Sequence, residues 1–204
     1  MTKKHDIIWL DVTDSTNDEA ARRISDLDNL SVLSGASQTS GRGQRTNIWI
    51  SEPGKNLTFT IVLKYRHPGS PDDGTLLPPF EARGQKIISD ITAESVISFL
   101  RKHGISGTVK LPNDILVNGR KICGILIEHS VRGMYLTHSR VGIGLNVNQT
   151  DFDPSIPNPT SMALQLEEKG PVHNSGLDLN SCLEDFMDVF THALLQRLQP
   201  DPQP

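Results

Sequence analysis

The chain has 204 residues, of which 36% are hydrophobic and 22% are charged, and its formal net charge is −4 at neutral pH. These values are typical of a globular protein of one or two domains and exclude an intrinsically disordered chain. A mildly acidic chain is also a poor candidate for a DNA-binding protein, because neutralising phosphates requires clustered Lys and Arg.

The first third of the chain is predicted to form strands around one helix. Thr16 and Glu19 have the spacing of a capping box, and the apolar residues that follow predict a helix from about Asn17 to about Asp28. A loop that carries glycines and arginines is expected over residues 38–51. Apolar or β-branched runs predict strands over three segments: residues 7–10, 31–36 and 57–64.

The rest of the chain is predicted to hold two long helices with a group of strands between them. Prolines and glycines indicate a loop over residues 66–79 and another over residues 151–159. Helical spacing of apolar residues predicts helices over residues 84–103 and from about 183 to 198. Asn118-Gly119 is a strong hairpin signal. The strands expected between the helices are residues 109–111, 115–117, 122–129, 135–137 and 141–147.

This order of elements predicts an α+β fold in which helices flank a mixed, largely antiparallel sheet. We expect one domain over residues 1–198 and a frayed tail over residues 199–204. The first residues are not followed by an apolar segment long enough for a signal peptide, and no apolar run approaches the roughly 18 residues of a membrane span. Two cysteines without CxxC spacing fit a reducing compartment, so we expect a cytoplasmic protein with no membrane partner.

Ser15-Thr16-Asn17 lies between a predicted strand and the start of a helix. Short polar side chains and unsatisfied backbone N–H groups meet there, which suits a small polar ligand head. Helix capping explains Ser or Thr at this position equally well. Taken alone, the segment favours the capping interpretation.

The 38–51 loop contains a Gly-Arg-Gly segment between Gln38 and Trp49. Gly41 and Gly43 permit close backbone approach to a ligand, and arginines match phosphate geometry. Trp49 offers a flat face to a purine. A solvated surface turn is the alternative, but Gln38 and Trp49 on either side make the segment less easy to explain as chance.

Two strand-rich segments complete the candidate motifs. In Lys110-Leu111-Pro112-Asn113-Asp114 the proline breaks a strand and leaves polar residues at a turn. Lys121 enters the next apolar strand, where its charge is placed to neutralise a carboxylate or phosphoryl oxygen, and Gly124 indicates close approach to the backbone. An exposed hairpin with a bulge is the alternative. In the segment 141–148, Asn146 has an amide able to contact a base or ribose, but the segment is not a dinucleotide fingerprint.

Together these segments resemble the catalytic domain of the biotin protein ligases. The family pattern reads Ser-Thr-Asn, Gln-x-x-Gly-Arg-Gly-Arg-x-Gly-Arg-x-Trp, Lys-Trp-Pro-Asn-Asp, Lys-x-x-Gly-Ile-Leu-x-Glu and Gly-x-Gly-x-Asn-x-Asn. All five motifs occur here in the same order, from Ser15 to Asn148, and the weaker resemblance extends over nearly the whole chain. The resemblance implies the biotin/lipoate ligase fold, with a mixed sheet and helices on one side.

The resemblance also implies roles for individual residues. Lys121 and Arg42 would be catalytic: Lys121 would contact the biotin carboxylate and the α-phosphate, and Arg42 would lie in the loop that folds over biotin and the adenylate and would stabilise charge. The residues implied in biotin binding are Ser15, Thr16, Asn17, Gln38, Arg42, Gly43, Gln44, Lys121 and Gly124. The residues implied in binding ATP or the adenylate are Arg42, Arg45, Trp49, Lys110, Asn113, Asp114 and Asn146. Mg²⁺ is expected on the phosphate side, and the sequence assigns no metal ligands.

The implied reaction has two steps, with ATP and biotin as substrates. The biotin carboxylate attacks the α-phosphorus of ATP, and a lysine of a biotin carboxyl carrier protein then takes the biotin from biotinyl-5′-AMP. A lipoate or octanoate ligase of the same fold, and a non-catalytic biotin-binding regulatory module, are the alternatives. A monomer and a homodimer both stay open.

The chain departs from the family pattern in two ways. Gln44, Thr46, Asn47 and Leu111 replace an arginine, a glycine, another arginine and a tryptophan. The loop therefore carries two fewer positive charges, and we hypothesise weaker retention of the adenylate. Only 14 residues precede Ser15, so we expect no helix-turn-helix domain and no repressor role. We also expect the small C-terminal β-barrel domain of many relatives to be absent or removed.

Overall fold

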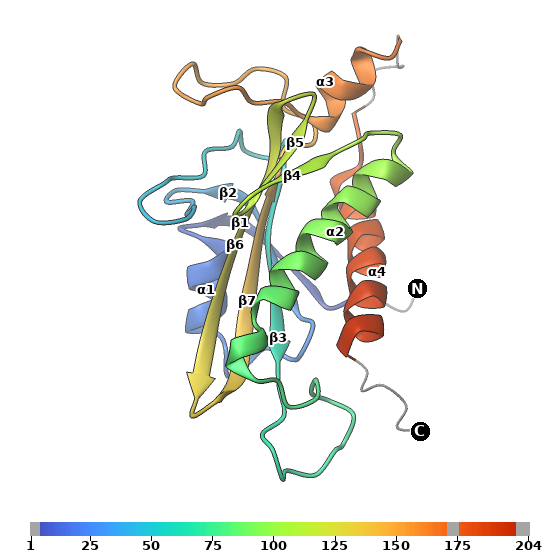
Figure 1. Ribbon diagram of the computed structural model, residues 1–204. Coiled ribbons are helices and arrows are strands. Elements are labelled where there is room, and N and C mark those ends of the chain that lie inside the picture. Colours follow the sequence, from blue (N-terminus) through green and yellow to red (C-terminus); the bar gives the residue numbers. More distant parts are fainter. Residues whose placement is uncertain (1–4, 171–175, 199–204) are drawn as a thin grey trace.

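In the computed structural model, which describes residues 5–170 and 176–198, seven strands form one curved sheet (Figure 1). The order across the sheet is β1-β2-β3-β7-β6-β5-β4. The pair β1 and β2 is parallel and the other neighbouring pairs are antiparallel. The strands are β1 (Ile7–Thr13), β2 (Val32–Gln38), β3 (Leu57–Lys64), β4 (Thr108–Lys110), β5 (Asp114–Val117), β6 (Arg120–Arg132) and β7 (Tyr135–Leu145). The predicted α+β fold with a mixed, largely antiparallel sheet is confirmed.

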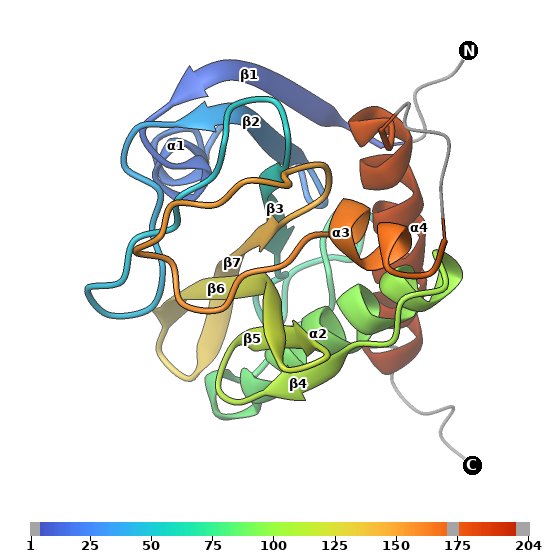
Figure 2. The same ribbon diagram turned by 90° about the horizontal axis from the view of Figure 1, so that it is seen from above.

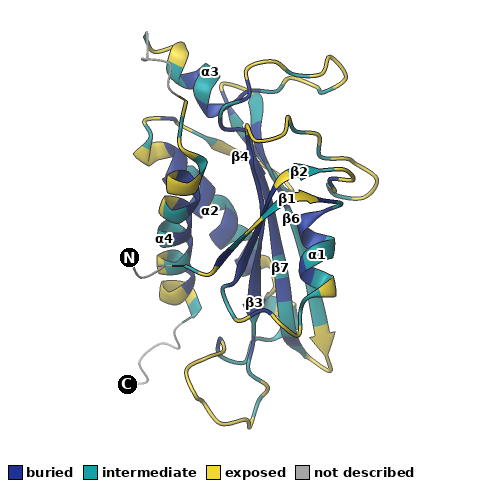
Figure 3. Cartoon of the chain, turned by 180° about the vertical axis from the view of Figure 1, so that it is seen from behind, coloured by how far each residue is buried: buried dark blue, intermediate teal, exposed yellow. Residues whose placement is uncertain are grey.

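Helices lie on both faces of this sheet (Figures 1 and 3). The long helices α2 (Lys86–Lys102) and α4 (Leu179–Leu198) pack together on one face. The short helix α1 (Thr16–Arg22) lies on the other face, against β2, β3 and β7. The resemblance implied helices on one side only, and α1 corrects that expectation. A short helix α3 (Met162–Glu167) and a 3₁₀ turn over Ala82–Gly84 complete the elements.

The alternation of side chains along the strands produces two different layers. In β3, the apolar residues Leu57, Phe59, Ile61 and Leu63 face α2 and α4 and belong to the large core. The ring of Phe59 meets that of Phe186 edge to face at 5.3 Å. The alternate residues of β3 face α1, where Val62 joins a smaller cluster with Ala20, Leu27 and Leu33. The large core therefore lies wholly on one side of the sheet.

Several predicted boundaries differ from the structure. The first helix was expected to reach Asp28, but α1 ends at Arg22 and turns follow, because the polar residues after it favour turns over helix. The two strands expected over residues 135–137 and 141–147 are the single strand β7, which is held by neighbours on both sides. Helix α3 was not predicted; the Ser161 hydroxyl caps it by accepting from the N–H of Leu164. The predicted frayed tail lies outside the described residues.

Viewed from above, the strand ends and three connecting segments gather at one end of the sheet (Figure 2). These segments are the loop over residues 38–51, the turn between β4 and β5, and the coil over residues 151–159. The sequence motifs lie on or beside these segments. In the part of the chain that the structure describes, no helix is both long and apolar enough to span a membrane.

Candidate active site

Glycines hollow the middle of the sheet on its α1 face. Across β3, β7 and β6, Thr58 pairs with Gly144, which in turn pairs with Gly124. One step along, Thr60 pairs with Gly142. A methyl group on Gly142 would overlap the Asn17 side chain, and one on Gly144 would overlap the Trp49 ring. The glycines therefore let two side chains from elsewhere lie directly on the sheet.

The start of α1 forms one wall above this floor. Ser15, Thr16 and Asn17 are each less than 5% exposed, although all three line a cavity that lies above the glycines. The backbone N–H of Thr16 donates to Oε1 of Gln38 at 2.8 Å. The Ser15 side chain makes no capping hydrogen bond to the helix, so capping does not account for it. This favours the ligand interpretation of the segment over the capping one.

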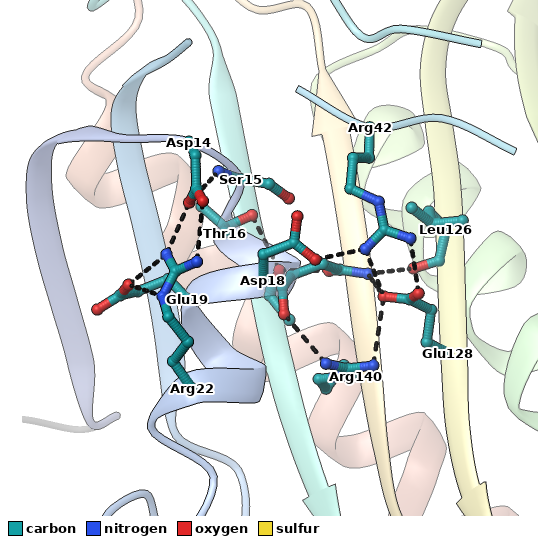
Figure 4. A network of polar contacts seen from close by, with 12 residues as sticks. Asp14, Ser15, Thr16, Asp18, Glu19, Arg22, Arg42, Leu126, Glu128 and Arg140 are labelled. Atoms are coloured by element: carbon teal, nitrogen blue, oxygen red, sulfur yellow. Dashed lines mark hydrogen bonds and ion pairs between the residues drawn. The ribbon is translucent and has the colours of Figure 1, made fainter. Parts of the chain in front are cut away.

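Arg42 ties the 38–51 loop to the sheet and to α1 (Figure 4). Its guanidinium donates to Oδ1 of Asp18 at 2.5 Å and to Oε1 of Glu128 at 2.8 Å. Burial raises the pKa of Glu128, but hydrogen bonds from Arg42 and Asn17 and the charge of Arg140 outweigh it, so the pKa lies below its ordinary value. Arg42 thus bridges two carboxylates, one on α1 and one on β6.

Trp49 lies across Gly124 and Gly144. The Nζ atom of Lys121 is 5.7 Å from the centre of the indole ring, and the same ammonium pairs with Oδ1 of Asp114 at 2.8 Å. The indole N–H of Trp49 is buried and has no hydrogen-bond partner among the described residues. The resemblance implied that Gly124 takes part in biotin binding, and in this structure Gly124 lies under the tryptophan ring.

Two cavities meet at this tryptophan. The first encloses about 110 Å³ between the start of α1, the 38–51 loop and the glycine floor. The second encloses about 440 Å³ between β4, β5 and the coil over residues 151–159, within the usual range for a small-molecule site. Five residues line both cavities: Asn47, Ile48, Trp49, Asp114 and Lys121. A charged lysine therefore stands at the junction of two neighbouring spaces.

The structure brings almost all the predicted site residues to these cavities. Those lining the first are Ser15, Thr16, Asn17, Gln38, Arg42, Gly43, Gln44, Trp49, Asn113, Asp114, Lys121 and Gly124. Lys110 and Asn146 line the second. Nδ2 of Asn146 donates to the carbonyl oxygen of Thr160 at 2.9 Å, and its Oδ1 is buried without a partner in the described part of the chain. Arg45 is exposed and lines neither cavity, so its implied role stays a prediction.

Sequence reasoning assigned no role to three residues that support the site: Thr60, Glu128 and Arg140. Glu128 closes the Lys-x-x-Gly-Ile-Leu-x-Glu motif, and that position was the available signal. Thr60 alternates with apolar residues in β3, a pattern that marks a polar face of a strand. The coil over residues 151–159 was predicted only as a loop, yet Phe152 and Ile156 form walls of the second cavity.

The site offers positioning and charge rather than a nucleophile. The Cys123 thiol is fully buried, and burial raises its pKa, so it is inert. Among residues 5–170 and 176–198, no cluster of three or more His, Cys, Asp or Glu side chains could hold a metal by itself. Among the described residues that line either cavity, Asp114 is the single carboxylate.

Comparison with known families gives one match over most of the chain. Residues 9–146 match the model of the biotin/lipoate A/B protein ligase family. The "Bifunctional ligase/repressor BirA" of Bacillus subtilis is 30% identical over 163 residues, which cover 76% of this chain and 46% of that protein. The "Biotin--[acetyl-CoA-carboxylase] ligase" of Paracoccus denitrificans is 31% identical over 135 residues, covering 66% of this chain and 52% of that protein. The chain thus spans about half the length of these curated relatives.

Solved structures share the fold. The biotin protein ligase of Aquifex aeolicus, in complex with biotin and ATP, superposes with a TM-score of 0.67 at 24% identity, over 97% of this chain and 73% of that one. The biotin acetyl coenzyme A carboxylase synthetase of Helicobacter pylori gives a TM-score of 0.59 at 17% identity, over 95% of this chain and 80% of that one. A biotin protein ligase-like protein of unknown function from Silicibacter gives 0.66 at 10% identity, over 97% and 73% of the two chains.

Proposed function

This chain belongs to the biotin/lipoate A/B protein ligase family, and from that premise we propose that it is a biotin protein ligase. It activates biotin with ATP to form biotinyl-5′-AMP and transfers the biotin to a lysine of a biotin carboxyl carrier protein. The carrier assignment draws on the name of the Paracoccus denitrificans relative, which is a ligase for acetyl-CoA carboxylase. The two free, buried cysteines are compatible with a cytoplasmic location.

One observation carries the proposal: the two cavities meet at Lys121. An acid held over the glycine floor and a nucleotide held in the larger cavity would place a carboxylate and an α-phosphate on either side of this ammonium. Their mutual repulsion is the main obstacle to adenylation, and a fixed positive charge reduces it. Lys121 is already oriented by Asp114 and Trp49, so little ordering is needed when the substrates bind.

The chemistry requires no protein nucleophile. A carboxylate oxygen of biotin attacks the α-phosphorus, the bond to the β-phosphate oxygen breaks, and pyrophosphate leaves. The neutral amine of the carrier lysine then attacks the carbonyl carbon of the mixed anhydride, AMP leaves, and the amine proton passes to solvent. Arg42 lines the first cavity and its guanidinium is partly exposed, so it is placed to exchange its carboxylate partners for the adenylate anion.

Mg²⁺ would enter with the nucleotide. Protein sites for Mg²⁺ commonly supply one or two carboxylates and leave the other positions to phosphates and water. Asp114, which lines both cavities, and its neighbour Asn113 fit that need. When bound, the ion would offset phosphate charge.

The deciding experiment is pyrophosphate release with ATP and Mg²⁺, supplied in parallel with biotin, lipoate or octanoate. We expect release with biotin alone. Release with lipoate or octanoate would agree with the fold but would contradict biotin as the substrate. Binding of biotin without release would point to a regulatory module.

A further inference from the structure

A buried glutamine connects two segments that form walls of the second cavity. Gln149 follows β7 and is 5% exposed, and its side chain lines neither cavity. Its Oε1 atom accepts from the backbone N–H of Glu52 at 3.0 Å, and its Nε2 atom donates to the carbonyl oxygen of Asp151 at 2.8 Å. One amide therefore joins the end of the 38–51 loop to the start of the coil over residues 151–159.

The two attachment points are next to the cavity walls in the sequence. Ile50, two residues before Glu52, lines the second cavity, and so does Phe152, which follows Asp151 directly. Figure 2 shows the loop and the coil at the same end of the sheet. A change in the distance between the two attachment points would therefore move one wall relative to the other.

A second buried side chain sets the orientation of the Gln149 amide. The backbone N–H of Val147 donates to Oδ1 of Asn56 at 2.9 Å, so the amide nitrogen of Asn56 faces Gln149. That nitrogen donates to Oε1 of Gln149 at 2.5 Å. Because a backbone N–H only donates and a backbone carbonyl only accepts, each of the two amides has a single orientation that satisfies its partners. Gln149 and Asn56 together form a clasp between the loop and the coil.

The coil has another attachment at its opposite end. The backbone N–H of Lys121 donates to the carbonyl oxygen of Asn158 at 2.9 Å, and the N–H of Thr160 donates to the carbonyl oxygen of Lys121 at 2.9 Å. Nδ2 of Asn158 also donates to the carbonyl oxygen of Gly119 at 2.9 Å. The coil is therefore held at one end by the backbone of β6 and at the other end by the side chain of Gln149.

The first cavity is closed by contacts that do not involve the clasp. Arg42 pairs with Asp18 on α1 and with Glu128 on β6. Within the loop, the backbone N–H of Trp49 donates to the carbonyl oxygen of Gly41 at 2.9 Å. These contacts hold the loop over the glycine floor whether or not the clasp is intact. Loosening the clasp should therefore affect the second cavity more than the first.

We propose that Gln149 is a positioning residue for the nucleotide: it fixes the spacing between the loop wall and the coil wall of the second cavity, and so sets the affinity for ATP without contacting it. The inference rests on the proposed function and deepens it, because it takes the second cavity as the nucleotide site. Walls that are already in place need no ordering when the ligand binds, so that cost is not subtracted from the affinity. Removing the amide should weaken the binding of ATP and leave the binding of the acid nearly unchanged.

The test measures pyrophosphate release by Gln149→Met, which keeps the length of the side chain but removes its three hydrogen bonds. We expect KM for ATP to rise about tenfold, while KM for biotin and kcat at saturating ATP stay within about twofold of the wild-type values. Titration calorimetry with α,β-methylene ATP, in which a carbon replaces the bridging oxygen that must break, should show the same loss of affinity. A general loss of folded protein would instead lower kcat and leave both KM values unchanged.

Asn29→Leu is the matched control. Oδ1 of Asn29 accepts from the backbone N–H of Lys64 at 3.0 Å, so this amide also joins a turn to a strand, but it lines neither cavity. The control should leave KM for ATP unchanged even where it lowers the free energy of unfolding.

Two outcomes would overturn the inference alone: an unchanged KM for ATP in folded Gln149→Met, or an equal rise in KM for ATP and for biotin. Gln149→Ala supplies a second variant without the amide if Gln149→Met does not fold. A wild-type protein that releases no pyrophosphate with any of the three acids would overturn the proposed function and this inference with it.

Discussion

The two faces of the sheet differ although the same strands build both. Toward α2 and α4, β7 presents Val141, Ile143 and Leu145, which pack into a dry apolar core. Toward α1, the intervening residues Arg140, Gly142 and Gly144 leave room for polar side chains and for the first cavity. The period of two along a strand thus separates the residues that stabilise the fold from those that form the site. Changes on one face should therefore leave the other largely unaffected.

The largest effect should follow from opening the apolar face. Phe186 contacts Phe59 at 5.3 Å and Phe99 at 6.0 Å between ring centres. Phe186→Ala should lower the free energy of unfolding by about 3–5 kcal/mol, measured by urea denaturation. Its biotin affinity, measured where the variant is still folded, should stay close to wild type. A folded variant that had lost biotin binding would contradict the separation of the two faces.

Removing the positive charge of Lys121, where the two cavities meet, should lower activity and leave stability almost unchanged. Lys121→Ala should slow biotin-dependent pyrophosphate release by about 10²- to 10³-fold, because one fixed charge on the developing transition state is lost. The urea midpoint should barely change. Lys86→Ala, which removes an exposed lysine paired with Asp90 on α2, is the matched control. Near-normal release in Lys121→Ala would refute the assignment.

A methyl group on the glycine floor should have an intermediate effect. In Gly144→Ala the new carbon would overlap the Trp49 ring, which must shift from the wall that both cavities share. We expect pyrophosphate release to fall about tenfold, with a stability loss of about 1–3 kcal/mol that is smaller than that of Phe186→Ala. Wild-type kinetics would show that Trp49 does not need its present position.

The 38–51 loop has fewer positive charges than the family pattern, and this difference should affect retention of the adenylate. Gln44 lines the first cavity where the family pattern has an arginine. Gln44→Arg should slow release of biotinyl-5′-AMP by about fivefold, which corresponds to about 1 kcal/mol, without changing the urea curve. The off-rate is measured by stopped-flow mixing of the preformed adenylate complex with excess biotin. An off-rate already as slow in the wild type as in the variant would remove the leakage hypothesis.

The smallest effect concerns acid stability on the polar face. The pKa of Glu128 lies below its ordinary value of 4.5 in the folded protein. Its ionised form therefore stabilises the fold above about pH 4.5, and this contribution disappears as the pH falls through the lowered folded pKa. Glu128→Gln should be less stable than wild type by up to about 1 kcal/mol at pH 7, and the gap should narrow on acidification. Urea denaturation curves from pH 7 to pH 3 measure this difference in the free energy of unfolding. A difference that widened in acid would contradict a lowered pKa for Glu128.

The sequence predicted the residues of the site better than the way they contact one another. The motifs assigned Ser15, Gln38 and Lys121 to one candidate site, and all three residues line the first cavity. They meet there because each motif lies at a strand end on the same side of the sheet. The position of Trp49 over Gly144 depends on how a loop folds back onto a strand almost a hundred residues later, and local patterns carry no such information. Thr60 was missed for the same reason, since its partners come from α1.

The helices show a similar limit. The spacing of apolar residues predicted α2 within a few residues, because this helix packs along much of its length. It overestimated α1, where Leu27 is buried although the residues around it form turns. Burial of a side chain does not require a helix, and short elements are decided by their tertiary neighbours.

Trp49 also gives the protein an intrinsic fluorescent probe of ligand binding. The chain has two tryptophans, and the other, Trp9, is 44% exposed on the edge strand β1, away from the cavities. Trp49 sits beside an ammonium group, between two cavities, with its indole nitrogen shielded from water. Its emission must respond to whatever enters either space, while Trp9 contributes a constant background. Binding of each substrate is therefore readable from intrinsic fluorescence, with no label attached.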